Sequence, residues 1–572
     1  MPTLQFKGKT FVQNHHLAVK YHQLVPKKEL SLTDPAFGGT GSISLHDNLI
    51  IEDDNLKALK ALLPTYSGKV KCIHIDPPYN TGNENWAYND NVNSPMIKDW
   101  LGKVVDKEDL TRHDKWLCMM MPRLKLLREL LSEDGAIFIS CDDNEQHNLR
   151  CLLDKIFGGQ NFIQNIIWQK KYSPQNDAKY FSDMHDFIIC YAKNKIEGEQ
   201  KIGCQRNLLE RTEEMNDRYS NPDNDERGDW KPSYFSVKTY SKEYDYPITL
   251  PSDRIVNPPN GRSWNTSKEN FEKLIDENRV WFGEAGNNIP SIKKFITEVK
   301  QGSVPVSIWG YKEVGHNQEE KQELKEIFDE IQLPFDTPKP VKLLKRIIEI
   351  ASNKDDIILD SFAGSGTTAH AVLELNKEDG GNRKFILVEQ EVYASTITAE
   401  RVRRIIKRLN ADLSNSDIDM IKNKKQKDAA IKNQANQVNP QNHSSDSFSY
   451  FELGSIIEME SILQGKNLPS YDEFARYIFY TATGEEFNQN KINEKTGFIG
   501  ETKNYELYMF YKPDVEWLKR NALTLDGVKA MAKFKGKQRL VFAQAKYVDD
   551  DTCRENRIDF CQLPYEIYRI QN

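Results

Sequence analysis

The stretch DDIILDSFAGSGTTAHAVLELNKEDGGNRKFILVEQ, residues 355–390, decides the class of fold. An apolar run ends in Asp360, a glycine-rich turn leads into a helical segment, and a second apolar run ends in Glu389. Alternating strand and helix predict a parallel sheet. Gly364 and Gly366 allow a ligand close to the backbone, and the helix start favours an anionic group. We therefore predict an α/β domain with a ligand site at its strand ends.

The same alternation occurs earlier in the chain. DNLKALKALLP has helical spacing, and KVKCIHID is a strand-like run that ends in Asp76. DKWLCMMMPRLKLLRELLSEDG then predicts an apolar helix closed by Gly135, and AIFIS predicts a short buried strand. These segments predict a doubly wound, Rossmann-like α/β core built from two halves, residues 1–195 and 326–410.

The alternation of predicted strands and helices is absent between the two halves and after the second one. Residues 196–325 are rich in Asn, Pro, Gly and aromatic residues, which predicts an irregular inserted domain. Residues 411–447 are rich in Asn, Lys, Gln and Ser and predict a linker. Residues 448–572 carry apolar and aromatic runs again and predict a small C-terminal α+β domain.

Composition narrows the class of protein. The 572 residues are 38% hydrophobic and 28% charged, and no run approaches the ~20 apolar residues of a membrane span. The eight cysteines are scattered without a C-x-x-C pair, which favours a reducing cytoplasm and no metal site. A net charge of −7 excludes coating of nucleic acid by bulk charge but allows a local basic surface. Residues 401–440 hold ten Lys or Arg against four Asp or Glu, and either a solvated helix with a linker or a DNA-facing patch would explain them.

The residues DPPY, Asp76–Tyr79, stand at the end of a predicted strand. Two prolines stiffen the loop and remove two N–H donors, so carbonyl groups point outward. Such a loop suits methylation of an amine whose lone pair is delocalised, because the Asp76 carboxylate and the Pro77 carbonyl can accept its two N–H bonds. Tyr79 offers a ring on which a base can stack. The alternative is an ordinary Pro-Pro turn with a capping Asp.

The glycine-rich turn and Glu389 together predict a nucleoside site. Glu389 follows the turn at the interval at which an acid holds ribose hydroxyls. A Rossmann dehydrogenase is one alternative, although it needs a third glycine where Thr367–Ala369 stand, and a tight turn without a ligand is another. The shorter turn suits a nucleoside without pyrophosphate, such as S-adenosylmethionine.

In combination, DPPYNTG at 76–82 and FAGSGTT at 362–368 resemble the amino-methyltransferases of DNA in the permuted β-class order. Asp at position 76 resembles the adenine-N6 enzymes. IEDDNLKALKAL, WFGEAGNNIPSIKKF and PKPVKLLKRII extend the resemblance over most of residues 45–410, to the methylation (Mod) subunits of Type III restriction–modification systems. Ser361 stands where this family usually has proline.

The resemblance assigns roles to individual residues. It places Asp76, Pro77, Pro78 and Tyr79 around a target adenine. It places the cofactor on Asp360, Phe362, Ala363, Gly364, Ser365, Gly366 and Glu389. Lys339 is a further partner for the cofactor carboxylate, or else a solvated lysine. For four other residues the expectations are less specific: Trp86 as base pocket or core, His185 as a satisfied buried His, and Asp142 and Asp143 as caps of the next helix.

The resemblance implies methyl transfer from S-adenosylmethionine to adenine N6 in a specific duplex DNA sequence, with the base flipped out. It implies that 196–325 is the target-recognition domain, that the protein is a cytoplasmic homodimer, and that an ATP-dependent restriction (Res) subunit is its partner. This chain has no Walker G-x-x-x-x-G-K-[ST] loop of its own. Neither a metal nor a membrane is expected. An orphan methyltransferase without a restriction partner and a non-catalytic DNA-recognition subunit stay as alternatives.

Overall fold

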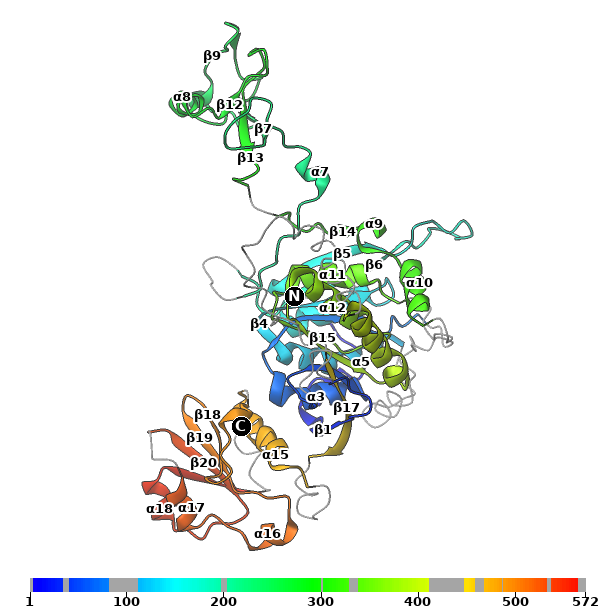
Figure 1. The fold of residues 1–572 in the computed structure, drawn as a ribbon, viewed down its shortest axis with the longest axis vertical. Helices are drawn as coiled ribbons and strands as arrows, with labels where there is room; N and C mark the ends of the chain where they lie inside the picture. The colour runs from blue at the N-terminus through cyan, green and yellow to red at the C-terminus, as the bar shows by residue number, and fades with distance from the viewer. Residues whose placement is uncertain are drawn as a thin grey trace, which may run out of the picture. The chain divides into compact units, whose positions relative to one another are not determined.

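The computed structural model describes residues 4–33, 41–81, 112–196, 203–299, 302–328, 338–410, 447–457, 468–485, 487–531 and 536–563. The chain divides into two compact units (Figure 1). One unit comprises Met1–Arg206 with Val306–Asn572, and the other comprises Asn207–Pro305. Trp86 lies outside the described residues.

A ten-stranded mixed sheet forms the centre of the larger unit, within the part of the chain described. Its order is β1 (His22–Pro26), β17 (Phe448–Ile456), β2 (Asn48–Glu52), β16 (Lys384–Glu389), β15 (Ile357–Asp360), β3 (Val70–Ile75), β4 (Leu131–Cys141), β6 (His185–Ala192), β5 (Phe162–Gln169) and β14 (Ile308–Trp309). Neighbours from β17 to β4 are parallel, whereas β6 runs antiparallel to β4 and to β5. The predicted α/β fold class with a parallel core is confirmed.

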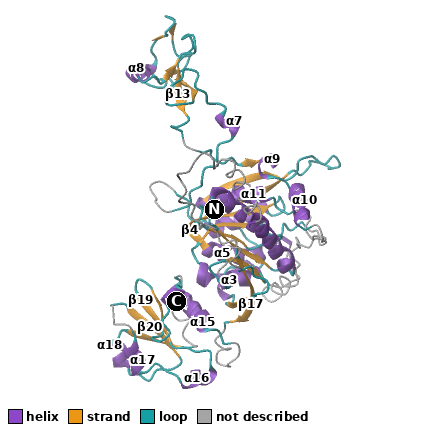
Figure 2. Cartoon of the chain, viewed as in Figure 1, coloured by secondary structure: helices purple, strands orange, loops and turns teal. Residues whose placement is uncertain are grey.

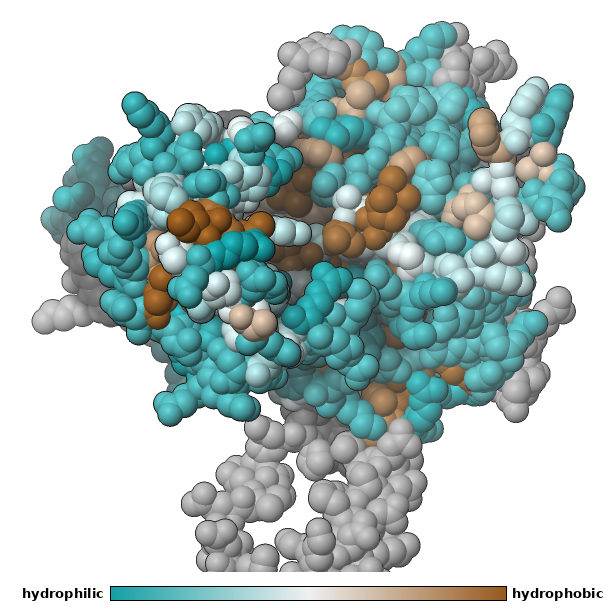
Figure 3. All heavy atoms as spheres, turned by 90° about the horizontal axis from the view of Figure 1, so that it is seen from above, coloured by the Kyte–Doolittle hydropathy of each residue, from teal (hydrophilic) through white to brown (hydrophobic). Residues whose placement is uncertain are grey.

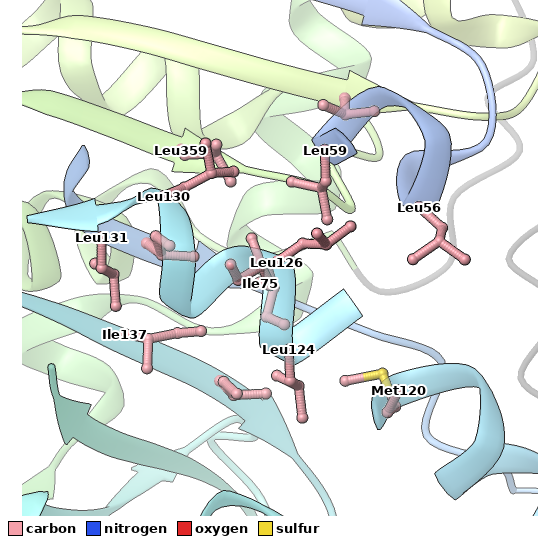
Figure 4. Close-up of a cluster of buried hydrophobic side chains, with 14 of the residues drawn as sticks. Leu56, Leu59, Ile75, Met120, Leu124, Leu126, Leu130, Leu131, Ile137 and Leu359 are labelled. Carbon is pink, nitrogen blue, oxygen red and sulfur yellow. The ribbon is translucent and has the colours of Figure 1, made fainter. Parts of the chain in front are cut away.

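Helices cover both faces of this sheet. The main ones are α3 (Asn55–Tyr66), α5 (Arg112–Leu130), α6 (Gln146–Phe157), α11 (Val341–Ala351) and α12 (Thr367–Asp379). Figure 4 shows leucines of α3 and α5 packed with Ile75, Ile137 and Leu359 from three strands. Alternation turns His74 to the opposite face, where Asp360 binds Thr368 of α12. The fold is therefore doubly wound.

The helix predicted to run to Gly135 ends at Leu130 instead, because residues 131–141 pair with β3 as strand β4. A Cβ on Gly135 would lie 3.0 Å from the Lys71 carbonyl oxygen, so glycine here permits close approach of two strands. The expectation that Asp142 and Asp143 cap the following helix is wrong, because the N-cap residue of α6 is Glu145. The Asp142 carboxylate instead binds the backbone (2.9 Å) and side chain (2.7 Å) of Asn144 in a turn before α6.

Strand β17 differs from the expected boundary of the C-terminal domain. Residues 448–456 pair with β2 and β1 and so extend the large sheet. A separate four-stranded sheet follows, formed by β18 (Phe498–Glu501), β19 (Tyr505–Met509), β20 (Gln538–Ala543) and β21 (Ile558–Gln562). Strand β17 therefore belongs to the large sheet and not to the C-terminal domain, because it pairs with β2 and β1.

The unit Asn207–Pro305 has a small core of its own, built around Trp264, Phe271 and Phe235. Its elements are α7 (Glu213–Asn216), β7 (Trp230–Tyr234), β8 (Ser236–Val237), β9 (Ile248–Thr249), β10 (Ile255–Val256), β11 (Ser263–Trp264), α8 (Lys268–Asp276), β12 (Val280–Trp281) and β13 (Ser291–Phe295). Lys293 is buried and ion-paired with Asp225 at 3.1 Å. Further helices among the described residues include α1 (Lys9–Val12), α2 (His15–Ala18), α9 (Tyr311–Val314), α10 (Asn317–Ile327), α15 (Tyr471–Thr483), α16 (Val515–Arg520), α17 (Leu525–Ala530) and α18 (Asp550–Glu555), and Figure 2 colours the chain by type of secondary structure.

The surface in Figure 3 is mainly hydrophilic, with separate hydrophobic patches. Among the described residues, every helix is too short or too polar to cross a membrane.

Candidate active site

Three parallel strands bring the predicted site residues to one edge of the sheet. β15 lies between β3 and β16, with Leu359 opposite Ile73 and Asp360 opposite Leu387. Parallel neighbours end at the same edge, so the segments that follow these strands meet there. Two loops are thereby defined: the base loop, Asp76–Tyr79 after β3, and the cofactor loop, Phe362–Gly366 after β15.

Hydrogen bonds close the cofactor loop. Asp360 accepts from the Phe362 N–H at 3.0 Å and from the Thr368 hydroxyl at 2.5 Å. Gly364 and Gly366 have φ angles of 52° and 83°, in the left-handed region that favours glycine. A Cβ on Gly366 would lie 3.2 Å from the carbonyl oxygen of Thr398. The two glycines thus permit a turn that other residues would strain or fill.

Glu389 lies at the end of β16 and is only 3% exposed. It accepts a hydrogen bond from the Gly364 N–H at 2.7 Å, and its other oxygen accepts from the backbone of Gln390 and Glu391. Burial raises the pKa of Glu389 to about 8, against the opposing effect of these backbone donors. The acid therefore lies directly against the glycine-rich turn, and its role on a ribose stays a prediction.

A buried ion pair supports the cofactor loop from behind. Arg401 donates to the Ser365 hydroxyl at 3.0 Å and to Glu320 at 2.6 Å, and all three side chains are buried. Glu320 also accepts from the Val341 N–H, which fixes the start of α11. Burial raises the pKa of Glu320 to about 7, and Arg401 opposes that rise. Sequence reasoning missed this pair because no motif links residues so far apart.

The base loop has one carboxylate oxygen that is left without a partner. Asp76 Oδ2 accepts from the Lys339 ammonium group at 2.6 Å. Its Oδ1 atom is buried and has no hydrogen-bond partner among the described residues. The Pro78 carbonyl, by contrast, accepts from the Trp116 indole at 2.6 Å. A buried acceptor that lacks a donor costs stability and calls for an explanation, of which a catalytic role is one.

The residue after the base loop anchors it. Asn80 has φ 59° and is fully buried, and its amide donates to Glu145, which is also fully buried. Asn tolerates the left-handed region better than most residues. The loop is therefore held in place on the side away from Asp76.

Tyr79 contacts a second acid, Asp186, which the sequence did not suggest as a site residue. Its hydroxyl lies 3.5 Å from Asp186, which is 2% exposed and accepts from Lys170 at 2.6 Å. Burial raises the pKa of Tyr79, and nearby Asp186 and Asp76 add to the rise. Burial likewise raises the pKa of Asp186, while Lys170 opposes it. Asp186 comes from β6, which pairs with β4, so only the sheet brings it here.

Of the two expectations for Lys339, the solvated lysine is wrong, and the bond to the cofactor carboxylate stays a prediction. Lys339 is buried, and its ammonium group binds Asp76. Its ammonium group also lies 5.0 Å from the Tyr79 ring centre and 5.8 Å from that of Trp168. The fixed start of α11 carries Lys339 towards the end of β3.

His185 is partly buried, and its ring packs edge-on against Phe187 at 5.0 Å. Among the described residues no cluster of three or more His, Cys, Asp or Glu side chains could hold a metal ion.

An α/β sheet that places a polarising DPPY loop beside a glycine-rich turn and a buried acid has the architecture of an amino-methyltransferase. Residues 70–400, more than half of the chain, match the family N6_N4_Mtase, described as DNA methylase, and the chain belongs to this family.

Relatives from bacteria and a phage agree with this assignment. The StyLTI Mod subunit of a Type III restriction–modification enzyme of Salmonella typhimurium is 35% identical over 404 residues, 65% of this chain and 59% of that protein. The EcoPI Mod subunit of Escherichia phage P1 is 32% identical over 403 residues, which are 64% of this chain and 61% of that protein. The Type II methyltransferase M.KpnI of Klebsiella pneumoniae is 30% identical over 351 residues, which are 59% of this chain and 79% of that protein. The chain thus spans about 60% of the length of these Type III relatives.

S-adenosylmethionine is the cofactor of this class, and the residues present fit it. The positive-φ glycines leave room at the turn, and the buried Glu389 carboxyl adjoins it. Hydroxyl groups of a ribose are suitable donors for that carboxylate.

Proposed function

We propose that this chain transfers the methyl group of S-adenosylmethionine to the exocyclic N6 amine of adenine in duplex DNA. The observation that carries the proposal is the buried, unpartnered Oδ1 atom of Asp76 in a DPPY loop beside the cofactor loop. A carboxylate in this position offers a negative acceptor to an amine that becomes positively charged during transfer.

In the proposed mechanism the base loop prepares the amine. Asp76 Oδ1 and the Pro77 carbonyl accept the two N–H bonds of N6, which draws the nitrogen towards tetrahedral geometry and makes its lone pair available. The Pro78 carbonyl is already bound to Trp116, so this role falls to Pro77. The Tyr79 ring stacks on the base.

Lys339 orients Asp76 through a charge-assisted hydrogen bond to its other oxygen, Oδ2. It also leaves Oδ1 as the acceptor that faces the substrate. We therefore propose Lys339 as a positioning residue for Asp76.

S-adenosylmethionine, when bound, supplies an activated methyl group on a sulfonium. The sulfur leaves as a neutral thioether when the methyl group is transferred. Glu389 would accept hydrogen bonds from the ribose hydroxyls, and the cofactor loop Phe362–Gly366, with Asp360 before it, would hold the methionine part. Arg401 holds that loop rigid. Catalysis then comes chiefly from holding the two reactants in line.

The remaining parts of the proposal concern DNA and partners. The amine cannot be reached within a stacked duplex, so the target adenine is flipped out. The inserted region 196–325, which contains the compact unit Asn207–Pro305, reads base edges. The chain pairs with a Res subunit, which its similarity to Mod subunits of Type III enzymes supports. We further propose that it acts as a homodimer in the cytoplasm.

The test is modification-sensitive sequencing of DNA from cells that express this chain alone, beside cells that express Asp76→Ala. We expect N6-methyladenine in one sequence motif with the wild type and none with the variant. Methylation of cytosine instead would overturn the adenine assignment. DNA without any methylation would favour a non-catalytic recognition subunit. Replacing residues 196–325 by the counterpart from M.KpnI should change the motif and leave the methylated atom unchanged; an active chimera with the original motif would place recognition elsewhere.

A further inference from the structure

The loop between β5 and β6, residues 171–184, exposes aromatic side chains beside the active site. We call it the aromatic loop. Phe181 is 95% exposed and Tyr180 is 82% exposed, while Tyr172 is 54% exposed. The loop projects from the core in Figure 1. Large apolar rings gathered on one exposed segment mark an interaction site, because folding alone gains nothing from exposing them.

The root of the aromatic loop is ordered although its tip is exposed. The Lys170 N–H donates to the Met184 carbonyl at 2.9 Å, which continues the β5–β6 hairpin. The Gln175 N–H donates to the Ser182 hydroxyl at 2.7 Å across the loop. Tyr172 packs against His316 with ring centres 5.5 Å apart. These contacts hold the tip, Tyr180 and Phe181, at a defined place.

One root of the loop contacts the base loop, and the other lies near the lysine that binds Asp76. Lys170 and Asp186, which flank the aromatic loop, bind each other at 2.6 Å, and Asp186 contacts the Tyr79 hydroxyl. Trp168 lies two residues before Lys170 and is 5.8 Å from Lys339, the partner of Asp76. A base held by Asp76 and Tyr79 would therefore lie next to the root of the aromatic loop.

The polar residues of the loop suit a duplex with a phosphate backbone. Lys171 and Lys179 lie on it, and Lys179 is 5.3 Å from the Tyr180 ring. Of its two acids, Asp177 and Asp183, the latter is paired with Lys170 at 2.8 Å. Rings at the tip with lysines behind them match proteins that insert apolar side chains into the base stack.

We propose that the tip of the aromatic loop enters DNA at the target base pair, and that Phe181 and Tyr180 stack in the space left by the extruded adenine. The inference rests on the proposed function, since it supplies the device that keeps the base out. Stacking on the exposed bases offsets part of the cost of unpairing and unstacking the adenine.

The test compares the double variant Tyr180→Ala/Phe181→Ala with wild type and with Tyr547→Ala, a control that removes a 77% exposed tyrosine far along the chain. Methyl transfer is measured on a duplex carrying the motif found by sequencing. The double variant should lose about 10- to 100-fold in kcat/KM, the size expected for lost base stacking. Tyr547→Ala should match the wild type, and calorimetry should show unchanged cofactor affinity in all three. Phe181→Trp, which keeps a ring, should retain activity.

A second duplex, in which the target adenine faces a mismatched base, separates a wedge from general DNA binding. Unpairing is already cheaper there, so the double variant should recover to within about threefold of the wild type. Equal rates of double variant and wild type on the paired duplex would overturn the inference. An equal loss on both duplexes would also overturn it and would make the loop a plain DNA contact. Absence of adenine methylation by the wild type would overturn the proposed function itself.

Discussion

The base loop and the cofactor loop stand on neighbouring strands, yet they are held in opposite ways. The cofactor loop is closed by one continuous segment, residues 360–401, as Asp360 binds Phe362 and Thr368, Gly364 binds Glu389 and Arg401 binds Ser365. The base loop depends on distant ones: Lys339 is 263 positions from Asp76 along the chain. The cofactor loop is largely satisfied by its own surroundings, whereas the base loop keeps a buried acceptor without a donor.

This difference teaches how the two loops should respond to substitution. A self-closed loop is shaped by small residues and backbone groups, so damage to it should appear in cofactor affinity. A loop with an unpartnered acceptor interacts fully only when the substrate amine arrives, so damage to it should appear in turnover. The predictions below test this separation, beginning with the largest effect.

Asp76→Ala should give the largest effect. Loss of the carboxylate removes the acceptor for the amine and the negative charge beside it, so kcat should fall by about 10²–10³-fold or more. The affinity for S-adenosylmethionine should stay within about twofold, because Asp76 belongs to the base loop. Radiolabelled methyl transfer and calorimetry measure the two quantities. Near-normal turnover would remove Asp76 from the active site.

Gly366→Ala should act on cofactor affinity. The new Cβ would lie 3.2 Å from the Thr398 carbonyl at a φ of 83°, so the turn must shift, and the dissociation constant should rise about tenfold or more. Gly380→Ala is the matched control, since Gly380 has a φ of 67° with nothing within 4 Å of its Cβ. It should lower stability by about 1 kcal/mol and leave affinity unchanged. Equal affinity in both variants would separate the turn from the cofactor. Glu389→Ala and Gly364→Val should also weaken binding.

Lys339→Met tests whether Lys339 positions Asp76 or binds the cofactor carboxylate. If Lys339 positions Asp76, kcat should fall about tenfold while cofactor affinity changes by less than about threefold, because a charge-assisted hydrogen bond is worth about 1.5–3 kcal/mol. Lys339→Arg should restore part of the turnover. The reverse pattern, weaker cofactor binding with normal kcat, would return Lys339 to the cofactor carboxylate.

The smallest expected effect is on the pH dependence of stability, through protonation of Glu389. Its pKa is raised from 4.5 to about 8, so the folded protein without cofactor holds a proton that the unfolded chain has lost between these values. This contribution to stability is complete below about pH 4.5 and is lost as pH rises through about 8. Glu389→Gln should therefore flatten the fall in urea midpoint between pH 5 and about pH 9. An unchanged slope would contradict the raised pKa.

Cofactor binding should also release protons near neutral pH. Ribose hydroxyl groups donate to the ionised carboxylate and lower the pKa of Glu389 towards its ordinary value. Calorimetry in buffers of different ionisation enthalpy measures this release, which should be less than one proton per molecule. Glu389→Gln should abolish it.

By itself the sequence determined the α/β class, the family and the nature of the cofactor. These follow from short-range features, namely alternating apolar runs, DPPY at the end of one run and FAGSG at the end of another. The hydrogen bonds around FAGSG are local, as at Asp360, so this motif carries its own geometry. The ribose role of Glu389 stays a prediction, although its place beside Gly364 follows from the same strand spacing.

Only the tertiary structure decided which partners meet these motifs. Lys339 on Asp76, Asp186 on Tyr79 and Arg401 on Glu320 join residues from distant segments. Strand β17 likewise joined the large sheet and not the C-terminal domain. The physical reason is common to all four. Each pairing is set by strand order and helix docking across the whole core, and the residues involved carry no local pattern that distinguishes a buried partner from a solvated charge.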